Sequence, residues 1–189
     1  EKAGLSRNDL GDKVFYGETG GVTLSGGEPF AQADAAFELL KKCKDNKINT
    51  AIETCGFFDS TYIEKFSSVV DLLLWDIKDT NENRHIKNIG VSLNTILENL
   101  FAADKAEIKI RLRCVILKGI NGNSEHIKEI NEISKKIRNL QGIDLIPYHP
   151  YGESKYKRLG ITDTFDSPKY IPSDSLIKAL KKQLYTKSF

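Results

Sequence analysis

The alternation of short strand-like runs with longer helical patterns most constrains the fold of this chain. Five segments are rich in β-branched and bulky apolar residues, and segments with helical periodicity follow them. The expected strands cover about residues 21–25, 49–54, 69–78, 107–117 and 142–148. The third is an almost continuous apolar run, typical of a parallel strand covered on both faces. We therefore expect right-handed βαβ units, forming either a section of a barrel or an open doubly wound sheet.

Helical spacing and capping residues place helices between the strands. The apolar stripe of residues 33–44 includes Cys43, which we expect to be buried. Thr61 and Glu64 have the spacing of a capping box. The expected N-caps are Thr61, Ser92 or Asn94, Ser124 and Ser173.

Length and composition are those of one globular domain. The chain has 189 residues, of which 40% are hydrophobic and 29% charged. A net charge of +2 gives no reason to expect nucleic acid or a membrane surface as partner. We expect a single domain over 1–189, with a lead-in over 1–19 and a C-terminal helix over 172–187.

The first expected strand runs into the turn Gly26-Gly27-Glu28-Pro29. Glycines permit positive φ or a close backbone approach, and Pro29 removes a donor and keeps Glu28 extended. Such a turn places backbone amides and a carboxylate at the carboxyl end of a sheet, where α/β folds bind ligands. Taken alone, the turn equally fits a tight connection with a solvated glutamate.

The other four strands also end on polar side chains. These residues are Glu53, Asp76, Lys78, Arg113 and His149. The carboxyl ends of parallel strands share one rim, and Asp76 and Lys78, two residues apart, point to the same face. Each residue alone also fits a solvated charge or a local salt bridge. Because unpaired buried charge is costly, we expect the group to pair or to bind a polar, zwitterionic ligand.

The ligand that suits this rim has an amine, a carboxylate and hydroxyl groups. Glu28 and the adjacent carbonyls could accept an ammonium group. Lys78 or Arg113 could hold a carboxylate, which arginine does bidentately. Glu53 and Asp76 could hold hydroxyls, an amine or a hydrated cation. His149 could contact a flat base or a backbone group.

These motifs resemble those of radical S-adenosylmethionine enzymes, specifically the glycyl-radical-enzyme activases typified by pyruvate formate-lyase activating enzyme. The matching segments, in the family's order, are 21–29, 53–56, 76–78, 90–92, 113–116 and 147–156. The resemblance implies a partial (β/α)6 barrel of the TIM type, of which this chain supplies strands two to six.

The resemblance also implies S-adenosylmethionine as the cofactor. The implied binding residues are Gly26, Gly27, Glu28, Glu53, Asp76, Lys78, Arg113 and His149. The 26–28 turn would hold the methionyl amine, and Arg113 would lie near the methionyl or ribose end. Glu53, where relatives often have aspartate, would help to hold a monovalent cation together with Asp76.

In that family a 4Fe–4S cluster reductively cleaves S-adenosylmethionine to a 5′-deoxyadenosyl radical, which takes hydrogen from a glycine of a partner enzyme. The implied partner is a glycyl radical enzyme, pyruvate formate-lyase or a relative. Flavodoxin or ferredoxin would be the electron donor of the intact enzyme, in an anaerobic cytoplasm.

The family's cluster motif, Cys-x3-Cys-x2-Cys upstream of the Gly-Gly-Glu-Pro strand, does not occur in these 189 residues. A cluster needs several thiolates close together. Cys43, Cys55 and Cys114 lie on different expected elements and match no metal-binding spacing, so we expect reduced, buried thiols. With no methionine at its start, the chain is expected to be a truncated activase that is inactive alone and holds the cluster only at full length.

Two alternatives stay open. A cluster-free relative could act as a binding or scaffolding module for a glycyl radical protein. A (β/α) isomerase or aldolase could use Lys78 as a base or Schiff-base nucleophile. The second alternative lacks a phosphate-binding glycine-rich loop after the last strands, where barrels often have one.

Overall fold

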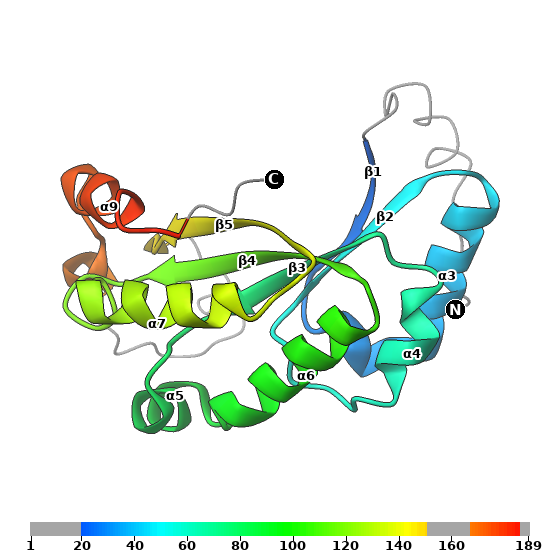
Figure 1. The fold of residues 1–189 in the computed structure, drawn as a ribbon, viewed down its shortest axis with the longest axis horizontal. Coiled ribbons are helices and arrows are strands. Elements are labelled where there is room, and N and C mark those ends of the chain that lie inside the picture. Colours follow the sequence, from blue (N-terminus) through cyan, green and yellow to red (C-terminus); the bar gives the residue numbers. More distant parts are fainter. Residues whose placement is uncertain (1–19, 151–166, 186–189) are drawn as a thin grey trace, which may run out of the picture.

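The computed structural model describes residues 20–150 and 167–185, and within them five strands form one parallel sheet (Figure 1). The strands are β1 (Gly21–Leu24), β2 (Asn49–Thr54), β3 (Leu72–Ile77), β4 (Lys109–Ile116) and β5 (Leu140–Pro147). Their spatial order is β1-β2-β3-β4-β5. A doubly wound sheet would reverse its order at a switch point, so the sequential order identifies a section of a barrel and confirms the predicted fold class.

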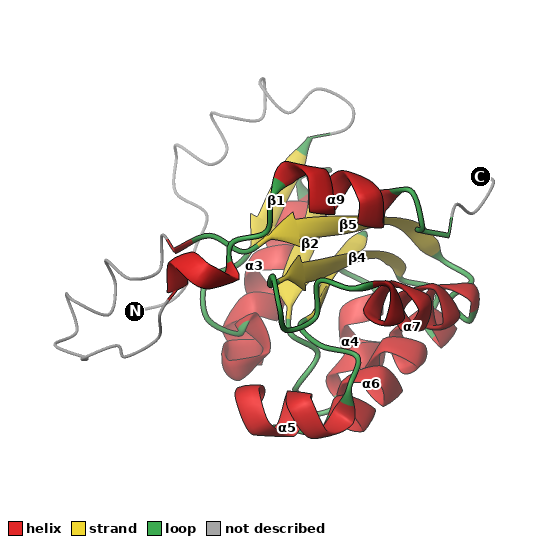
Figure 2. Ribbon diagram, turned by 90° about the vertical axis from the view of Figure 1, so that its left-hand side faces the viewer, coloured by secondary structure: helices red, strands yellow, loops and turns green. Residues whose placement is uncertain are grey.

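Helices connect consecutive strands, and α3, α4, α6 and α7 cover one face of the sheet (Figures 1 and 2). The helical elements are η1 (Pro29–Gln32), α3 (Ala33–Asp45), α4 (Tyr62–Ser67), α5 (Glu82–Ile89), α6 (Leu93–Lys105), α7 (Ser124–Lys135), η3 (Ser167–Tyr170) and α9 (Asp174–Lys181). Among the helices described, none is long and apolar enough to cross a membrane.

The sheet has two faces of different chemistry. On β4, Ile110, Leu112 and Cys114 are fully buried in the core beneath the helices, whereas Arg111 and Arg113 between them are only half-buried. The same alternation on β2, β3 and β5 exposes further charged side chains opposite the helices. We call this second side the open face; its charged strand residues are Glu53, Asp76, Lys109, Arg111, Arg113 and Asp144.

Several predicted boundaries and caps differ in the structure. The strand predicted over 69–78 covers Leu72–Ile77, because Val69 and Val70 are buried in the turn before it. Thr61 makes no capping hydrogen bond to α4, so the predicted capping box is wrong; Thr61 instead donates to Asp59.

Of the other predicted N-caps, two are confirmed and one is wrong. Ser92 and Ser173 are N-caps as predicted. Asn123 caps α7 in place of Ser124, since its side-chain oxygen accepts from the amide of His126. The last helix covers Asp174–Lys181 rather than 172–187, and the predicted lead-in over 1–19 lies outside the described residues.

Candidate cofactor site

The carboxylate of Glu28 ties the turn after β1 to the end of β2. It accepts hydrogen bonds from the Thr54 hydroxyl at 3.0 Å, from the Cys55 amide at 2.9 Å and from the Cys55 thiol at 3.0 Å. It also caps η1 by accepting from the Phe30 amide at 3.2 Å. Both oxygens are thus engaged, and the glycine turn is held in a fixed position against β2.

The turn and the ends of β2 and β3 enclose a cavity of about 350 Å³. Its lining residues are Gly26, Gly27, Glu28, Glu53, Thr54, Cys55, Asp76 and Lys78. A Cβ on Gly26 or Gly27 would meet nothing within 4 Å, so their backbone faces open space. The volume lies in the range of small-molecule sites.

A charged cluster on the open face adjoins this cavity. An Nη1 of Arg113 contacts a carboxylate oxygen of Glu53, and the same nitrogen lies 3.8 Å from Oδ1 of Asp76. The three side chains come from β2, β3 and β4 and are 34%, 18% and 23% exposed for Glu53, Asp76 and Arg113. Arg113 therefore lies between the two carboxylates.

Burial changes the acidity of two groups that line the cavity. It raises the pKa of Asp76 above its usual value, although Arg113 and Lys78 oppose the rise. Oδ1 of Asp76 is buried, accepts no hydrogen bond among the described residues and faces Nη1 of Arg113 at 3.8 Å. The Asp76 side chain lines the cavity, so its carboxylate is available there to a ligand donor. Burial and the hydrogen bond to Glu28 raise the pKa of the Cys55 thiol.

The structure brings together most of the residues predicted from the sequence. Six of the eight line the cavity, and Arg113 joins them through Glu53. His149 does not line the cavity; it is exposed and lies two residues beyond the end of β5. Thr54 and Cys55 also line the cavity but are not among the predicted binding residues, although they lie in the matching segment 53–56 directly after Glu53.

The residues present fit S-adenosylmethionine but not the iron–sulfur cluster. Glycine backbone, the carboxylate of Asp76 and a lysine around one cavity match the amine, hydroxyls and carboxylate of that cofactor. Of the three thiols, Cys43 and Cys114 are buried in the core, and only Cys55 reaches the cavity. No group of three or more His, Cys, Asp and Glu side chains in the described ranges is arranged to hold a metal ion.

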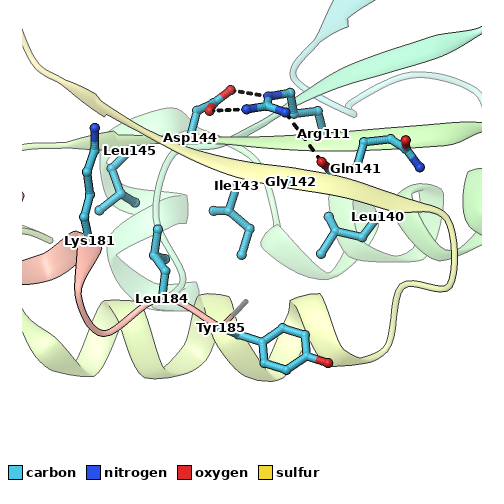
Figure 3. Close-up of a pocket in the computed structure, with 10 residues that line it drawn as sticks. All are labelled: Arg111, Leu140, Gln141, Gly142, Ile143, Asp144, Leu145, Lys181, Leu184 and Tyr185. Carbon is cyan, nitrogen blue, oxygen red and sulfur yellow. Dashed lines mark hydrogen bonds and ion pairs between the residues drawn. The ribbon is translucent and has the colours of Figure 1, made fainter. Parts of the chain in front are cut away.

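A second cavity, of about 410 Å³, lies along β5 and the segment after α9 (Figure 3). There Arg111 donates to both oxygens of Asp144, at 2.6 and 2.7 Å. The guanidinium passes over Gly142, where a Cβ would come within 2.8 Å of Nη1. Because these charges satisfy each other away from the 26–28 turn, we do not place the cofactor site here.

Comparison with known proteins agrees with the fold and the motifs. A model of the Radical SAM superfamily matches residues 9–134. The choline trimethylamine-lyase activating enzyme of Oleidesulfovibrio alaskensis is 40% identical over 153 residues, 79% of this chain and 49% of the relative. The pyruvate formate-lyase-activating enzyme of Streptococcus mutans is 33% identical over 183 residues, 94% of this chain and 69% of the relative.

Solved structures share the architecture. A domain of pyruvate-formate lyase-activating enzyme from Bacteroides vulgatus superposes with a TM-score of 0.70 at 24% identity, covering 87% of this chain and 92% of that domain. SuiB of Streptococcus suis bound to its precursor peptide superposes with a TM-score of 0.66 at 16% identity, covering 93% of this chain and 37% of that one. At these identities the likeness concerns the fold.

The chain spans about half the length of the first two curated relatives it matches, the second being the trans-4-hydroxy-L-proline dehydratase activating enzyme of Clostridioides difficile. The superfamily match covers about two thirds of this chain, and the Streptococcus mutans relative is covered over more than two thirds of its own length. This chain belongs to the Radical SAM superfamily, among the activating enzymes of glycyl radical enzymes.

Proposed function

We propose that this chain is the S-adenosylmethionine-binding part of a glycyl-radical-enzyme activating enzyme. The observation that carries the proposal is one cavity that the fixed glycine turn, the carboxylate of Asp76 and the side chain of Lys78 line together. The relatives are named as activating enzymes of pyruvate formate-lyase and of choline trimethylamine-lyase, which supports a glycyl radical enzyme as the partner.

Each residue of the cavity has a role in binding the cofactor. Carbonyl groups of the 26–28 turn accept the methionyl amine, while Glu28, already engaged by Thr54 and Cys55, keeps that turn in place. Lys78 pairs with the cofactor's carboxylate. Asp76 accepts from a hydroxyl or the amine through its carboxylate, which lines the cavity. When bound, S-adenosylmethionine supplies the radical chemistry of the superfamily; these residues orient it.

The complete activity belongs to a protein that also carries the cluster. Because the three thiols of this chain do not converge, we propose that the chain alone is inactive. Flavodoxin or ferredoxin as electron donor, and the cytoplasm as compartment, are part of the same proposal. The coding sequence upstream separates this proposal from a cluster-free scaffolding relative: a Cys-x3-Cys-x2-Cys motif in frame supports the activase, and a stop codon supports the relative.

Calorimetric titration with S-adenosylmethionine tests the site. We expect Asp76→Asn and Lys78→Ala each to weaken binding by about tenfold, the loss that removing one charge-assisted hydrogen bond produces. Asp144→Asn is the matched control, since this carboxylate lies on the same open face but pairs with Arg111 instead. His149→Ala tests whether the residue after β5 takes part. Unchanged affinity in both Asp76→Asn and Lys78→Ala would refute the proposal.

A further inference from the structure

In the cluster of Glu53, Arg113 and Asp76, one arginine side chain faces two carboxylates. Arg113 is the register partner of Asp76 across β3 and β4, and its side chain continues past that carboxylate to Glu53 on β2. Its guanidinium contacts Glu53 and stays 3.8 Å from Asp76. One fixed positive charge therefore bridges two carboxylates from two other strands.

A bound alkali metal ion between Glu53 and Asp76, which the sequence resemblance implied, does not fit this arrangement. Such an ion would have to lie in direct contact with oxygens of both side chains. The Arg113 nitrogen already contacts the Glu53 oxygen and faces the Asp76 oxygen, so it occupies that position. Oδ1 of Asp76, the oxygen that faces the guanidinium, is buried, so it offers a solvent cation no second approach.

Side-chain length explains why arginine can take this position. β2 and β4 are separated by β3, and strands are spaced by about 4.8 Å. Glu53 is level with Arg111 in the register of the sheet, so Arg113 must span two such spacings and an offset of two residues along the strands. Arg113 and Glu53 both have long side chains, and their sum covers the span. Aspartate at position 53 would be one methylene shorter and would leave a gap beside the guanidinium.

We propose that Arg113 acts as a built-in monovalent cation, so that Glu53 and Asp76 bind no alkali metal ion and the site is indifferent to K⁺ and Na⁺. Arginine suits this role because it stays charged at every physiological pH and is tethered at the site. The relevance of this inference to cofactor binding rests on the proposed function. The absence of a specific K⁺ or Na⁺ effect can be measured without the cofactor.

Thermal unfolding in different chloride salts, without S-adenosylmethionine, tests the inference on the protein and its variants. KCl and NaCl are compared at constant ionic strength with tetramethylammonium chloride, whose cation is too large for the gap. We expect the wild-type Tm to be the same in the three salts. In Arg113→Gln the two carboxylates lose their counter-charge, and we expect K⁺ or Na⁺ to raise Tm saturably by about 3 °C.

Two further variants keep the test decisive. Glu53→Asp retains Arg113 and opens the gap, so it should gain the same cation response even if Arg113→Gln does not fold. Arg111→Gln breaks the ion pair between Arg111 and Asp144 and leaves a single carboxylate without its partner. The Tm of this variant should therefore show no K⁺ or Na⁺ effect.

A saturable K⁺ or Na⁺ effect in the wild type that Glu53→Gln abolishes would overturn the inference, as would the lack of any gain in both Arg113→Gln and Glu53→Asp. Neither result bears on the calorimetric titration, which tests the proposed function separately.

Discussion

At the scale of single residues, the hydroxyl of Thr54 connects two segments of the candidate site. It donates to the Glu28 carboxylate and accepts from the amide of Gly56 at 3.0 Å, and the side chain is buried. Thr54 thereby links the turn after β1 to the loop after β2. Glu28 keeps its orientation because this partner is itself fixed within a strand.

Thr54→Val keeps the shape of the side chain and removes the hydroxyl. We expect the free energy of unfolding to fall by about 1–3 kcal/mol, because the amide of Gly56 loses its buried acceptor and Glu28 loses a donor. Urea unfolding measures this loss. We also expect weaker binding of S-adenosylmethionine in calorimetry, since the glycine turn is held less firmly.

Thr50→Val is the matched control. Thr50 lies near the other end of β2, is equally buried, and its hydroxyl donates to the Val69 carbonyl at 2.7 Å. The variant should lose a similar amount of stability and keep the affinity. Equal affinity in Thr54→Val and the wild type would show that Thr54 has no part in positioning the turn.

At the scale of elements, the loop after β2 is packed between an aromatic group and a helix. Asn99 on α6 donates to the carbonyls of Gly56 and Phe58, at 2.9 and 2.8 Å. Phe58 stacks on Phe30 of η1 with ring centroids 3.8 Å apart. Beneath the loop lies Trp75 of β3, fully buried. Two hydrogen bonds and one ring stack therefore join the loop to α6 and to η1.

Gly56→Ala tests how tightly this loop is packed. Gly56 has a φ of +78°, and a Cβ there would lie 2.4 Å from the Trp75 ring. We expect a loss of about 2–4 kcal/mol in the free energy of unfolding, from backbone strain and overpacking together. Gly90→Ala is the control: Gly90 has a φ of +89° but nothing within 4 Å of the added carbon. Its expected loss is only about 1 kcal/mol. Equal losses in the two variants would mean that the loop yields to the methyl group.

The elements of this fold could largely be predicted from local patterns, whereas the contacts at the site could not. The alternation on β4 specified which residues face the helices, and the buried thiol of Cys43 followed from helical spacing. The pairing of Glu53 with Arg113 depends on which strands are neighbours and on how far each side chain reaches. The exclusion of His149 from the cavity likewise depends on the path of the chain after β5. No pattern within one segment contains that information.

At the scale of the whole molecule, one buried histidine is expected to control stability in mild acid. His126 of α7 is buried, and its Nδ1 lies 2.7 Å from the Thr80 hydroxyl. Burial lowers the pKa of His126 to about 4. In the unfolded chain its pKa is near 6.5, so between these values the unfolded chain binds a proton that the folded protein does not. Stability therefore falls as the pH falls through this window.

We expect the free energy of unfolding to decrease by about 3 kcal/mol between pH 7 and pH 4 through His126 alone. Urea unfolding at a series of pH values measures the decrease, and His126→Gln should flatten it. The carboxylates whose pKa is lowered, such as Asp79 and Asp144, contribute stability that is lost only below about pH 4, outside most of this window. An unchanged profile in His126→Gln would assign the acid sensitivity to other groups.

The position of Trp75 gives the molecule an optical reporter. The sequence contains a single tryptophan, Trp75, which directly precedes Asp76 on β3. Its indole lies directly beneath Gly56. Tryptophan emission from this protein thus comes from one place, the core beneath the loop that follows Thr54 and Cys55. Its wavelength and intensity depend on how closely that loop covers the indole. Fluorescence can therefore report, without any attached label, how the loop after β2 packs against the core next to the candidate site.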